Sequence, residues 1–350
     1  MKYNKKVLAN MNKCYAIAMF SGSDQDSFLI ATEKTGPCRR FALDGTPLET
    51  VWEGPGGVMT MLQVPGRKNQ FLSTQEFYSP NCGGEDARIV TCTKQPDKSW
   101  KVDTLCDLPY VHRFGLLKAS NGQHWLLACT IKGSCEYKED WRSPGTVYAA
   151  LLPEDLSAFN KNNQLKLTVL LDGQFKNHGY FTAQNQQYAL ISTQSGVYQF
   201  VPPAKDGGEW AINCLLEQPV SDITQVDFDG DGRLELLTIS PFHGDELSIS
   251  QIGEDGKYHP VYQFPIQLPF LHAVWGGRLN GEPCAIIGHR KGERDLLRVY
   301  YDREKKEYQL EKIDHDCGSA NVLVYSYQSK DYIIAANREV NEVALYMAED

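Results

Sequence analysis

The sequence has no long hydrophobic run, and this absence excludes a helical membrane span. No segment approaches the roughly 20 apolar residues that cross a bilayer as a helix. The first twenty residues contain lysines, but they have no apolar stretch of roughly 7–15 residues and no small-residue cleavage site, so they are not typical of a signal peptide. We therefore expect a cytoplasmic protein with no membrane partner.

The chain also lacks an excess of basic residues. Its 35 lysines and arginines are outnumbered by 44 acidic residues, which gives a formal net charge of −9. Because neutralising phosphates requires Lys and Arg in excess, this balance disfavours a nucleic-acid partner, although it leaves room for a local basic pocket. The ten cysteines, at positions 14, 38, 82, 92, 106, 129, 135, 214, 284 and 317, include no C-x-x-C pair and are expected to be reduced core residues.

Long stretches with helical periodicity are missing, and so are three familiar catalytic signatures. There is no G-x-S-x-G, no H-E-x-x-H and no G-x-x-x-x-G-K-[ST]. The 18 tyrosines and 14 phenylalanines favour β structure. Short apolar segments bounded by Gly, Asn, Asp and Pro predict strands and turns throughout.

A loose repeat occurs seven times along the chain. Each unit has an apolar strand, a polar turn, a second apolar strand ending in polar residues, and two weaker strands. The units start near positions 14, 56, 111, 177, 221, 271 and 318, about 40–65 residues apart, which is typical of four-stranded propeller blades. The longest interval contains an insertion at about 133–163. The sequence thus predicts one all-β domain over residues 1–350, a seven-bladed β-propeller of antiparallel blades.

The last unit shows only three strands and ends in NEVALYMAED. The segment YNKKVLANM precedes the first unit and has no other partner, so we expect it to pair as the outer strand of the last blade. This pairing closes the ring and removes an exposed sheet edge. The alternatives are an irregular β-sandwich, two stacked β domains, or six or eight blades, because the first two repeats are faint.

One acidic loop, DFDGDGRLE, has the spacing of a calcium site. Asp227, Asp229, Asp231 and Glu235 offer hard carboxylate oxygens, and Arg233 offers its carbonyl. An Asp/Gly-rich hairpin without an ion uses the same residue types. The segment ITQVDFDGDGRLELLTIS resembles the FG-GAP (VCBS-type) repeat of integrin-like propellers. The resemblance implies a calcium-binding hairpin between the two inner strands, on the face away from the axial mouth.

A second pattern predicts the residues at the axial mouth, the opening of the central channel on the face away from the acidic loop. Alignment of the repeats brings His112, His178, Asp222 and His272 to nearly the same phase, just ahead of each inner strand. The other blades place at this phase the residues Tyr15, Gly57 and Ser319. Because inner strands surround the axis, equivalent positions converge. Three imidazoles and a carboxylate suit Zn²⁺ or Mn²⁺ with one position left for water or substrate. The alternative is that each is an ordinary polar residue at a strand end.

A second set of polar residues ends the second strand of each blade and is expected on the same face. Its members are Glu33, Lys34, Gln75, Glu76, Lys132, Gln194, His243, His289, Arg290, Asn337 and Arg338. From this set, we expect His289, Lys132 or His243 to accept a proton and Arg290 or Arg338 to stabilise an enolate. Gln194 and Asn337 are candidates for substrate binding. A solvated rim is the alternative.

The insertion contributes aromatic candidates for the same site. Trp141 and Tyr137 are expected to stack on the apolar C–H face of a sugar ring, or else to pack the insertion on its own blade. The histidine pattern resembles the metal-binding propeller part of aldos-2-ulose dehydratase and is similar in kind to oligogalacturonate lyase. These resemblances imply a metal-dependent lyase or dehydratase that acts on a keto-sugar, uronide or related small carbohydrate. The alternative is a non-catalytic propeller that binds a glycan or a partner protein, with calcium as its only metal.

Overall fold

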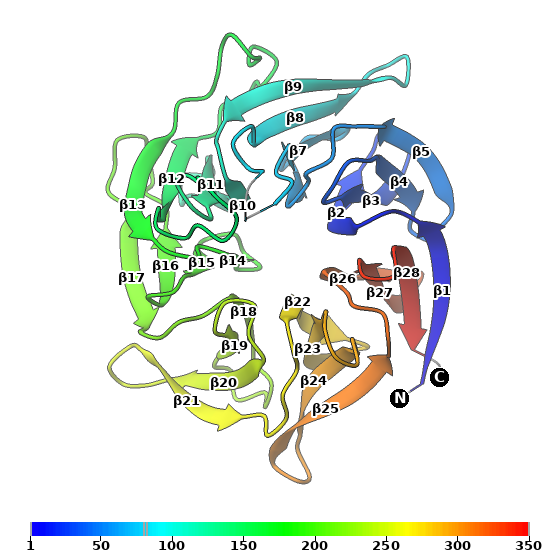
Figure 1. Cartoon of the computed structure of the whole chain (residues 1–350), viewed down its shortest axis with the longest axis vertical. Helices are drawn as coiled ribbons and strands as arrows, with labels where there is room; N and C mark the ends of the chain where they lie inside the picture. Colours follow the sequence, from blue (N-terminus) through cyan, green and yellow to red (C-terminus); the bar gives the residue numbers. More distant parts are fainter. Residues whose placement is uncertain (1, 80, 82, 349–350) are drawn as a thin grey trace.

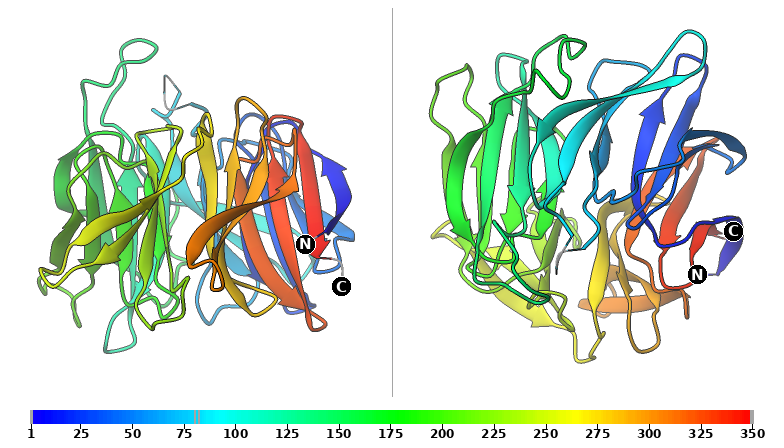
Figure 2. Two further views of the ribbon diagram at one scale, coloured as in Figure 1. Left: turned by 90° about the horizontal axis from the view of Figure 1, so that it is seen from below. Right: turned by 45° about the horizontal axis from the view of Figure 1, so that its top comes forward.

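The computed structural model describes residues 2–79, 81 and 83–348. Within them, 28 strands form seven four-stranded antiparallel sheets that surround a central axis (Figure 1). These residues contain no helix, and therefore none long and apolar enough to cross a membrane. The side view shows the blades standing next to one another around the ring (Figure 2). The prediction of an all-β, seven-bladed propeller is confirmed.

The first four blades follow the chain in simple meanders, with the first strand of each nearest the axis. Blade 1 consists of β2 (Cys14–Ser21), β3 (Asp26–Thr32), β4 (Cys38–Ala42) and β5 (Pro47–Trp52). Blade 2 consists of β6 (Met61–Gln63), β7 (Gln70–Gln75), β8 (Arg88–Lys94) and β9 (Trp100–Asp107). Blade 3 consists of β10 (Val111–Lys118), β11 (His124–Thr130), β12 (Gly145–Leu151) and β13 (Thr168–Gln174). Blade 4 consists of β14 (Gly179–Thr182), β15 (Ala189–Ser192), β16 (Val197–Val201) and β17 (Ala211–Leu216).

The remaining three blades complete the ring. Blade 5 consists of β18 (Asp222–Val226), β19 (Glu235–Ser240), β20 (Glu246–Ile252) and β21 (Tyr258–Gln263). Blade 6 consists of β22 (Leu271–Leu279), β23 (Glu282–His289), β24 (Leu296–Asp302) and β25 (Glu307–Asp314). Blade 7 consists of β26 (Asn321–Tyr327), β27 (Lys330–Asn337), β28 (Glu342–Ala348) and, on its outside, β1 (Tyr3–Asn10).

The ring closes as the sequence predicted. β1 pairs antiparallel with β28, from Tyr3 opposite Ala348 to Asn10 opposite Glu342 (Figure 1). The N-terminal strand therefore supplies the fourth strand of the last blade and covers an edge that would otherwise be open.

The second strand of each blade carries the clearest sequence signal, and burial explains why. β19 is buried at every position, and β3 and β11 are buried at all positions but the first. These strands lie between neighbouring blades, so both of their faces are covered and apolar residues predominate in their middle positions. The outer strands β13 and β21 are largely exposed to solvent and mix polar with apolar residues.

Two features of the repeat differ from expectation. The predicted insertion at about 133–163 is two loops, 131–144 and 152–167, because the apolar segment GTVYAAL between them is the third strand of blade 3. Blade 2 is faint because its inner strand is only Met61–Gln63. The residues before it bond to both neighbours: the N–H of Gly57, at φ +72°, donates to the carbonyl oxygen of Lys34 in blade 1, while its own carbonyl accepts from the N–H of Phe77 in blade 2.

The cysteines mostly fill the core, as predicted. Seven are buried and form no disulfide: Cys14, Cys38, Cys92, Cys106, Cys129, Cys284 and Cys317. Burial raises the pKa of their thiols, so they stay protonated and apolar in character. Cys82 lies outside the described residues.

Candidate functional site

β-Bulges direct the side chains at the start of the inner strands toward the axis. In β2, β10 and β22 the strand pairing skips one residue, and the skipped residues are Tyr15, His112 and His272. A bulge rotates the extra residue out of the ordinary alternation, and bulges are often found next to functional sites for this reason. The shared phase seen in the sequence therefore has a structural basis.

His178 belongs to the same phase although it has no bulge. It lies just before β14, and the residue two positions earlier has a left-handed backbone. The corresponding residues of four blades have positive φ: Lys13 (53°), Tyr110 (61°), Lys176 (51°) and Phe270 (62°). The chain thus enters these four blades through the same local turn, which fixes His178 in register with the other mouth residues.

Three imidazole nitrogens converge at the axis. One ring nitrogen from each of His178, His243 and His272 lies within 4.8 Å of the other two. The Nε2 atoms of His178 and His243 are 3.3 Å apart. Two nitrogens held about 2.1 Å from a tetrahedral Zn²⁺ are about 3.4 Å apart, so this spacing fits a metal ion. It is also a hydrogen-bond distance, so the pair can hold its place without an ion.

Hydrogen bonds behind two of these rings decide which nitrogen faces the group. Nδ1 of His272 is 2.8 Å from the carbonyl oxygen of Ala320, which can only accept. Nδ1 of His178 is 3.0 Å from Oδ2 of Asp222. In both rings Nδ1 therefore carries the proton and Nε2 keeps a lone pair, the arrangement that outer partners impose on metal-binding histidines. Asp222, expected as a direct ligand, instead contacts the far side of His178.

His243 joins the group through an unusual turn. It follows β19 with φ +50°, and its main-chain N–H donates to Oγ of Ser221. Its ring is stacked between Phe242, at 3.9 Å between centroids, and Phe270, at 4.5 Å. The left-handed backbone and the two aromatic faces fix the imidazole against the axis. His243 was predicted as a proton acceptor, and the geometry places it among the possible ligands.

His112 lies beside the group rather than within it. Its ring centroid is 4.6 Å from that of His178, and its Nδ1 has no hydrogen-bond partner among the described residues. Burial lowers the pKa of His112, His243 and His272 well below the usual histidine range, and nearby positive charge adds to the effect. All three are neutral at pH 7, the form in which imidazole binds a metal ion.

A cavity of about 320 Å³ adjoins these rings; we call it the mouth cavity. Four aromatic residues of its lining, which we call the aromatic wall, are Phe77, Trp141, Phe242 and Phe270. Trp141 reaches it from the 131–144 loop and packs edge-on against Phe242, with 5.1 Å between centroids. The insertion therefore contributes Trp141 to the lining of the mouth cavity, and its stacking on a sugar ring stays a prediction.

Charged side chains also line the mouth cavity, namely Glu33, Lys34, Glu139, Arg290 and Arg338. Arg290 lies over the Phe270 ring, so charged and aromatic groups are adjacent in the lining. The lining has three cations and two carboxylates, and a third carboxylate outside it fixes the two guanidinium groups from behind.

That carboxylate belongs to Glu339. Its Oε1 accepts from both Arg290 and Arg338, each at 2.7 Å, while Nε of Arg338 pairs with Glu33. Burial by itself would raise the pKa of Glu339, but the two arginines lower it to about 2. Glu339 is therefore ionised at neutral pH and holds both arginines in position.

Lys132 does not reach the mouth cavity. It is fully buried, its Nζ donates to the carbonyl oxygen of Asp140 at 2.6 Å, and it lies 3.9 Å from the ring centroid of Trp141. These contacts anchor the 131–144 loop. They place Lys132 in a structural position rather than the catalytic one that was expected.

His289 and Asn337 are also held by internal contacts. Nδ1 of His289 is 2.8 Å from the carbonyl oxygen of Lys291, and its Nε2 accepts the main-chain N–H of Asp295 at 2.9 Å. Asn337 donates to the hydroxyl of Tyr346 at 2.9 Å. Both ring nitrogens of His289 are thus engaged, which disfavours the proton-accepting role expected for it.

Two other candidates face solvent. Gln194 is exposed, and Tyr137 is 53% exposed with its ring over the guanidinium of Arg142. Neither lines the mouth cavity. Of the four predicted substrate-binding residues, the structure brings only Trp141 to the cavity.

The acidic loop joins β18 to β19, at the end of β18 away from the mouth. Carboxylate oxygens of Asp227, Asp229 and Glu235 lie within 4.8 Å of one another, a group that fits a hard cation. Asp231 instead binds its neighbour, with Oδ2 2.6 Å from a guanidinium nitrogen of Arg233. The predicted separation between the acidic loop and the mouth agrees with this placement.

Sequence reasoning missed the three phenylalanines of the aromatic wall, Phe77, Phe242 and Phe270. Phe242 directly precedes His243, and Phe270 lies two positions before His272. Aromatic residues this close to the aligned histidines were a usable signal. Phe77 and Met59 gave none, because they belong to the faintest repeat.

Comparison with known proteins gives a fold but no family. No family model matches the chain, and no curated protein matches it significantly. A streptogramin B lyase structure aligns with a TM-score of 0.58 and 11% identity, over 99% of this chain and 98% of that one. A protein from Lactobacillus plantarum aligns with a TM-score of 0.59 and 12% identity, over 90% and 89%. A protein described as a candidate 6-phosphogluconolactonase from Bacteroides uniformis aligns with a TM-score of 0.56 and 11% identity, over 97% and 93%. These likenesses show the fold alone.

Proposed function

We propose that the mouth cavity is the active site of a metal-dependent lyase, which performs β-elimination on a keto-sugar, uronide or related carbohydrate. The observation that supports it most is the convergence of three imidazole nitrogens beside a cavity with fixed arginines. Two similar structures are named as a lyase and as a candidate lactonase, which agrees with the proposal but rests on fold likeness.

His178, His243 and His272 would hold the ion, Zn²⁺ or Mn²⁺, since neutral imidazoles suit both. When bound, such an ion polarises a carbonyl or carboxylate oxygen and makes the adjacent C–H more acidic. Asp222 and the carbonyl of Ala320 keep two of the rings in the tautomer that binds.

The chain's own residues would handle charge and protons. Arg290 and Arg338 are placed to bind a sugar carboxylate and to stabilise negative charge that develops beside it. Glu33 and His112 line the cavity and are able to accept the proton on the α-carbon. The electron pair of that C–H bond then forms the double bond, and the β C–O bond breaks. The same residue would return its proton to the leaving oxygen, so that water or an alcohol is released. The aromatic wall would stack on the sugar ring.

Elemental analysis of the purified protein tests the metal. We expect one equivalent of zinc or manganese per chain, and we expect His243→Ala to lose it because one of three nitrogens is removed. His243 lies in a partly exposed loop, so the variant should stay folded. Asp229→Asn, in the acidic loop, is the matched control and should keep the transition metal. Wild-type protein that binds no transition metal, even after incubation with zinc or manganese, would contradict the proposal.

A substrate screen tests the reaction. Keto-sugars and uronides are incubated with the metal-loaded protein, and the unsaturated product is read by ultraviolet absorbance. Glu33→Gln and Arg290→Gln should each lower the rate by at least ten-fold. Binding of a glycan without any product would favour the non-catalytic reading instead.

A further inference from the structure

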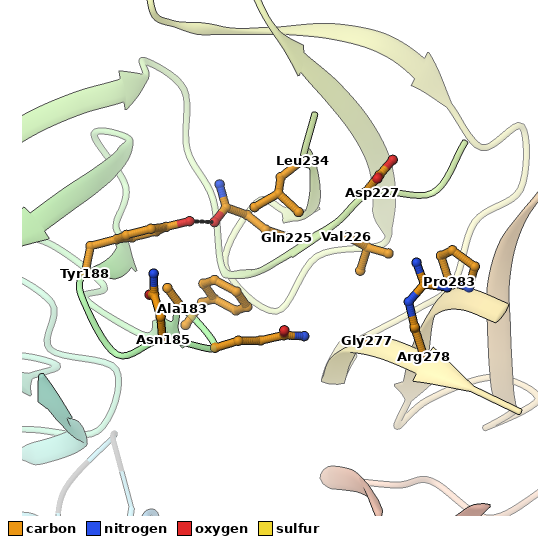
Figure 3. Close-up of a pocket in the computed structure, with 12 residues that line it drawn as sticks. Ala183, Asn185, Tyr188, Gln225, Val226, Asp227, Leu234, Gly277, Arg278 and Pro283 are labelled. Carbon is orange, nitrogen blue, oxygen red and sulfur yellow. Dashed lines mark hydrogen bonds between the residues drawn. The ribbon is translucent and has the colours of Figure 1, made fainter. Parts of the chain in front are cut away.

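A second pocket lies at the opposite end of the three blades that supply the converging histidines His178, His243 and His272. β14, β18 and β22 begin at the mouth, next to His178, Asp222 and His272, and their far ends surround this pocket (Figure 3). We call it the lower pocket. Its volume of about 400 Å³ is in the range of small-molecule sites, roughly 300–1,000 Å³. It shares no lining residue with the mouth cavity.

Two aromatic rings and three amides line the lower pocket. Phe181 of β14 and Tyr188, which directly precedes β15, supply the rings, both half-buried. Gln184 and Asn185 extend from the turn between these strands and are exposed, while Gln225 of β18 is buried. Figure 3 shows Tyr188 and Gln225 on one side of the pocket.

Hydrogen bonds fix the wall formed by Gln225. The hydroxyl of Tyr188 donates to Oε1 of Gln225 at 2.7 Å, and Nε2 of Gln225 donates to the hydroxyl of Tyr258 at 2.7 Å. The Tyr258 hydroxyl donates in turn to the carbonyl of Leu234 at 3.0 Å. The Tyr188 ring is thus held in one orientation, which lowers the entropy cost of stacking on a ligand. The amide of Gln225 retains one N–H and one lone pair for a ligand.

The lower pocket has few charged groups. Across from Tyr188 are Asp227 and Arg278 (Figure 3). The carboxylate of Asp227 accepts main-chain N–H groups of its own acidic loop, from Gly230 at 2.8 Å and Gly232 at 3.2 Å, so Arg278 is the main charged group available to a ligand. Arg278 uses one nitrogen to hold the carbonyl of Gly281 at 2.7 Å. A strongly anionic ligand would need more cations than this wall offers.

We propose that the lower pocket binds a neutral saccharide residue. Hydroxyl groups both donate and accept hydrogen bonds, and so do the amides of Gln184, Asn185 and Gln225. The ring faces of Phe181 and Tyr188 match the apolar C–H face of a pyranose. This site is independent of the proposed metal chemistry, because it has its own lining at the other end of the channel.

Ligand-observed NMR with defined sugars tests the proposal. The probes are the methyl glycosides of glucose, galactose, mannose and N-acetylglucosamine, together with cellobiose and lactose, and a titration follows for each sugar that binds. We expect wild-type protein to bind at least one of them. Tyr188→Ala should weaken binding about ten-fold or more, and Gln184→Ala, at an exposed position, about three- to ten-fold, as expected when one ring face or one to two hydrogen bonds are lost.

The matched control is Gln328→Ala, an exposed glutamine at the corresponding turn of blade 7, which should bind as wild type does. Thermal unfolding of each variant checks that it is folded. No binding of any neutral probe overturns the inference. The inference is also overturned if His243→Ala or Arg290→Gln abolishes sugar binding while Tyr188→Ala leaves it unchanged. The sugar would then lie in the mouth cavity. Tighter binding of glucuronate than of glucose, lost in Tyr188→Ala, would overturn the assignment to neutral sugars. If the protein binds no transition metal or shows no lyase activity, the proposed function fails, but sugar binding in the lower pocket is unaffected.

Discussion

Asp222→Asn perturbs the candidate metal centre without removing any of its three nitrogens. The Asp222 carboxylate is buried and lies 3.0 Å from Nδ1 of His178. Burial opposes its ionisation, but His178 and Arg113 bring the pKa of Asp222 below its usual range, so it is charged at pH 7. Asparagine has the same shape and can still accept from Nδ1, but it removes the negative charge that makes His178 a stronger ligand.

The expected loss follows from what such outer partners contribute. Removing one typically weakens metal affinity 10–100-fold, or about 1.4–2.7 kcal/mol. At free zinc 100 times the wild-type Kd, zinc stabilises the wild-type fold by about 2.7 kcal/mol and a 30-fold weaker variant by about 0.9 kcal/mol. A chain of 350 residues gains roughly 1.4 °C in Tm per kcal/mol, so zinc should raise Tm by about 4 °C in the wild type and about 1 °C in the variant.

Calorimetry with and without zinc, together with a chelator competition assay for Kd, measures both quantities. Asp231→Asn is the control for loss of one carboxylate elsewhere, since Asp231 lies in the acidic loop and forms its ion pair with its neighbour Arg233. An unchanged zinc Kd in Asp222→Asn would refute the argument that Asp222 directs and activates His178. An equal zinc-induced rise in Tm in the two proteins would refute it as well.

Three further predictions concern other parts of the molecule. Calcium should raise Tm in the wild type and in Asp231→Asn but not in Asp229→Asn, because Asp229 belongs to the converging carboxylates and Asp231 does not. Calorimetry with calcium and with a chelator measures the difference. Glu339→Gln should lower the free energy of unfolding by about 2 kcal/mol at pH 7, after allowance for its partial exposure. Because the folded pKa of Glu339, about 2, lies below its unfolded value of about 4.5, this stabilisation is complete above pH 4.5 and is lost as the pH falls toward 2. Denaturant titrations of the variant and the wild type should therefore give converging free energies of unfolding in that range. Lys132→Met should lower the free energy of unfolding by about 2–3 kcal/mol, because a hydrogen bond and the contact with Trp141 are lost. Limited proteolysis should then cut the 131–144 loop sooner than in the wild type, and unchanged cleavage would count against an anchoring role for Lys132.

The blade count could be predicted because second strands are covered on both faces. Segments such as LLACT in β11 and CAIIGH in β23 are apolar for that reason, and they recur at blade spacing. The phase of the mouth residues was also accessible, because the bulges at Tyr15, His112 and His272 keep a constant offset from the strands.

The full set of candidate metal ligands could not be predicted from the strand pattern. His243 reaches the axis through a left-handed residue after β19, and its position depends on the rings of Phe242 and Phe270, neither of which is encoded by strand periodicity. Lys132 and His289 follow the expected strands, but local loops determine where their side chains go. Strand periodicity predicts at which end of the sheet a residue lies. The conformation of the adjoining loop then determines which groups its side chain contacts.

The pairing of β1 with β28 joins the two strands that lie farthest apart in the described sequence. This pairing closes a very long loop, so its entropy cost is offset only once the intervening blades have stacked. While β1 is detached, the outer edge of β28 has no partner strand, and an uncovered edge can pair with a strand of another chain. We therefore expect ring closure to be a late step in folding, and detachment of β1 to promote association between copies of the chain.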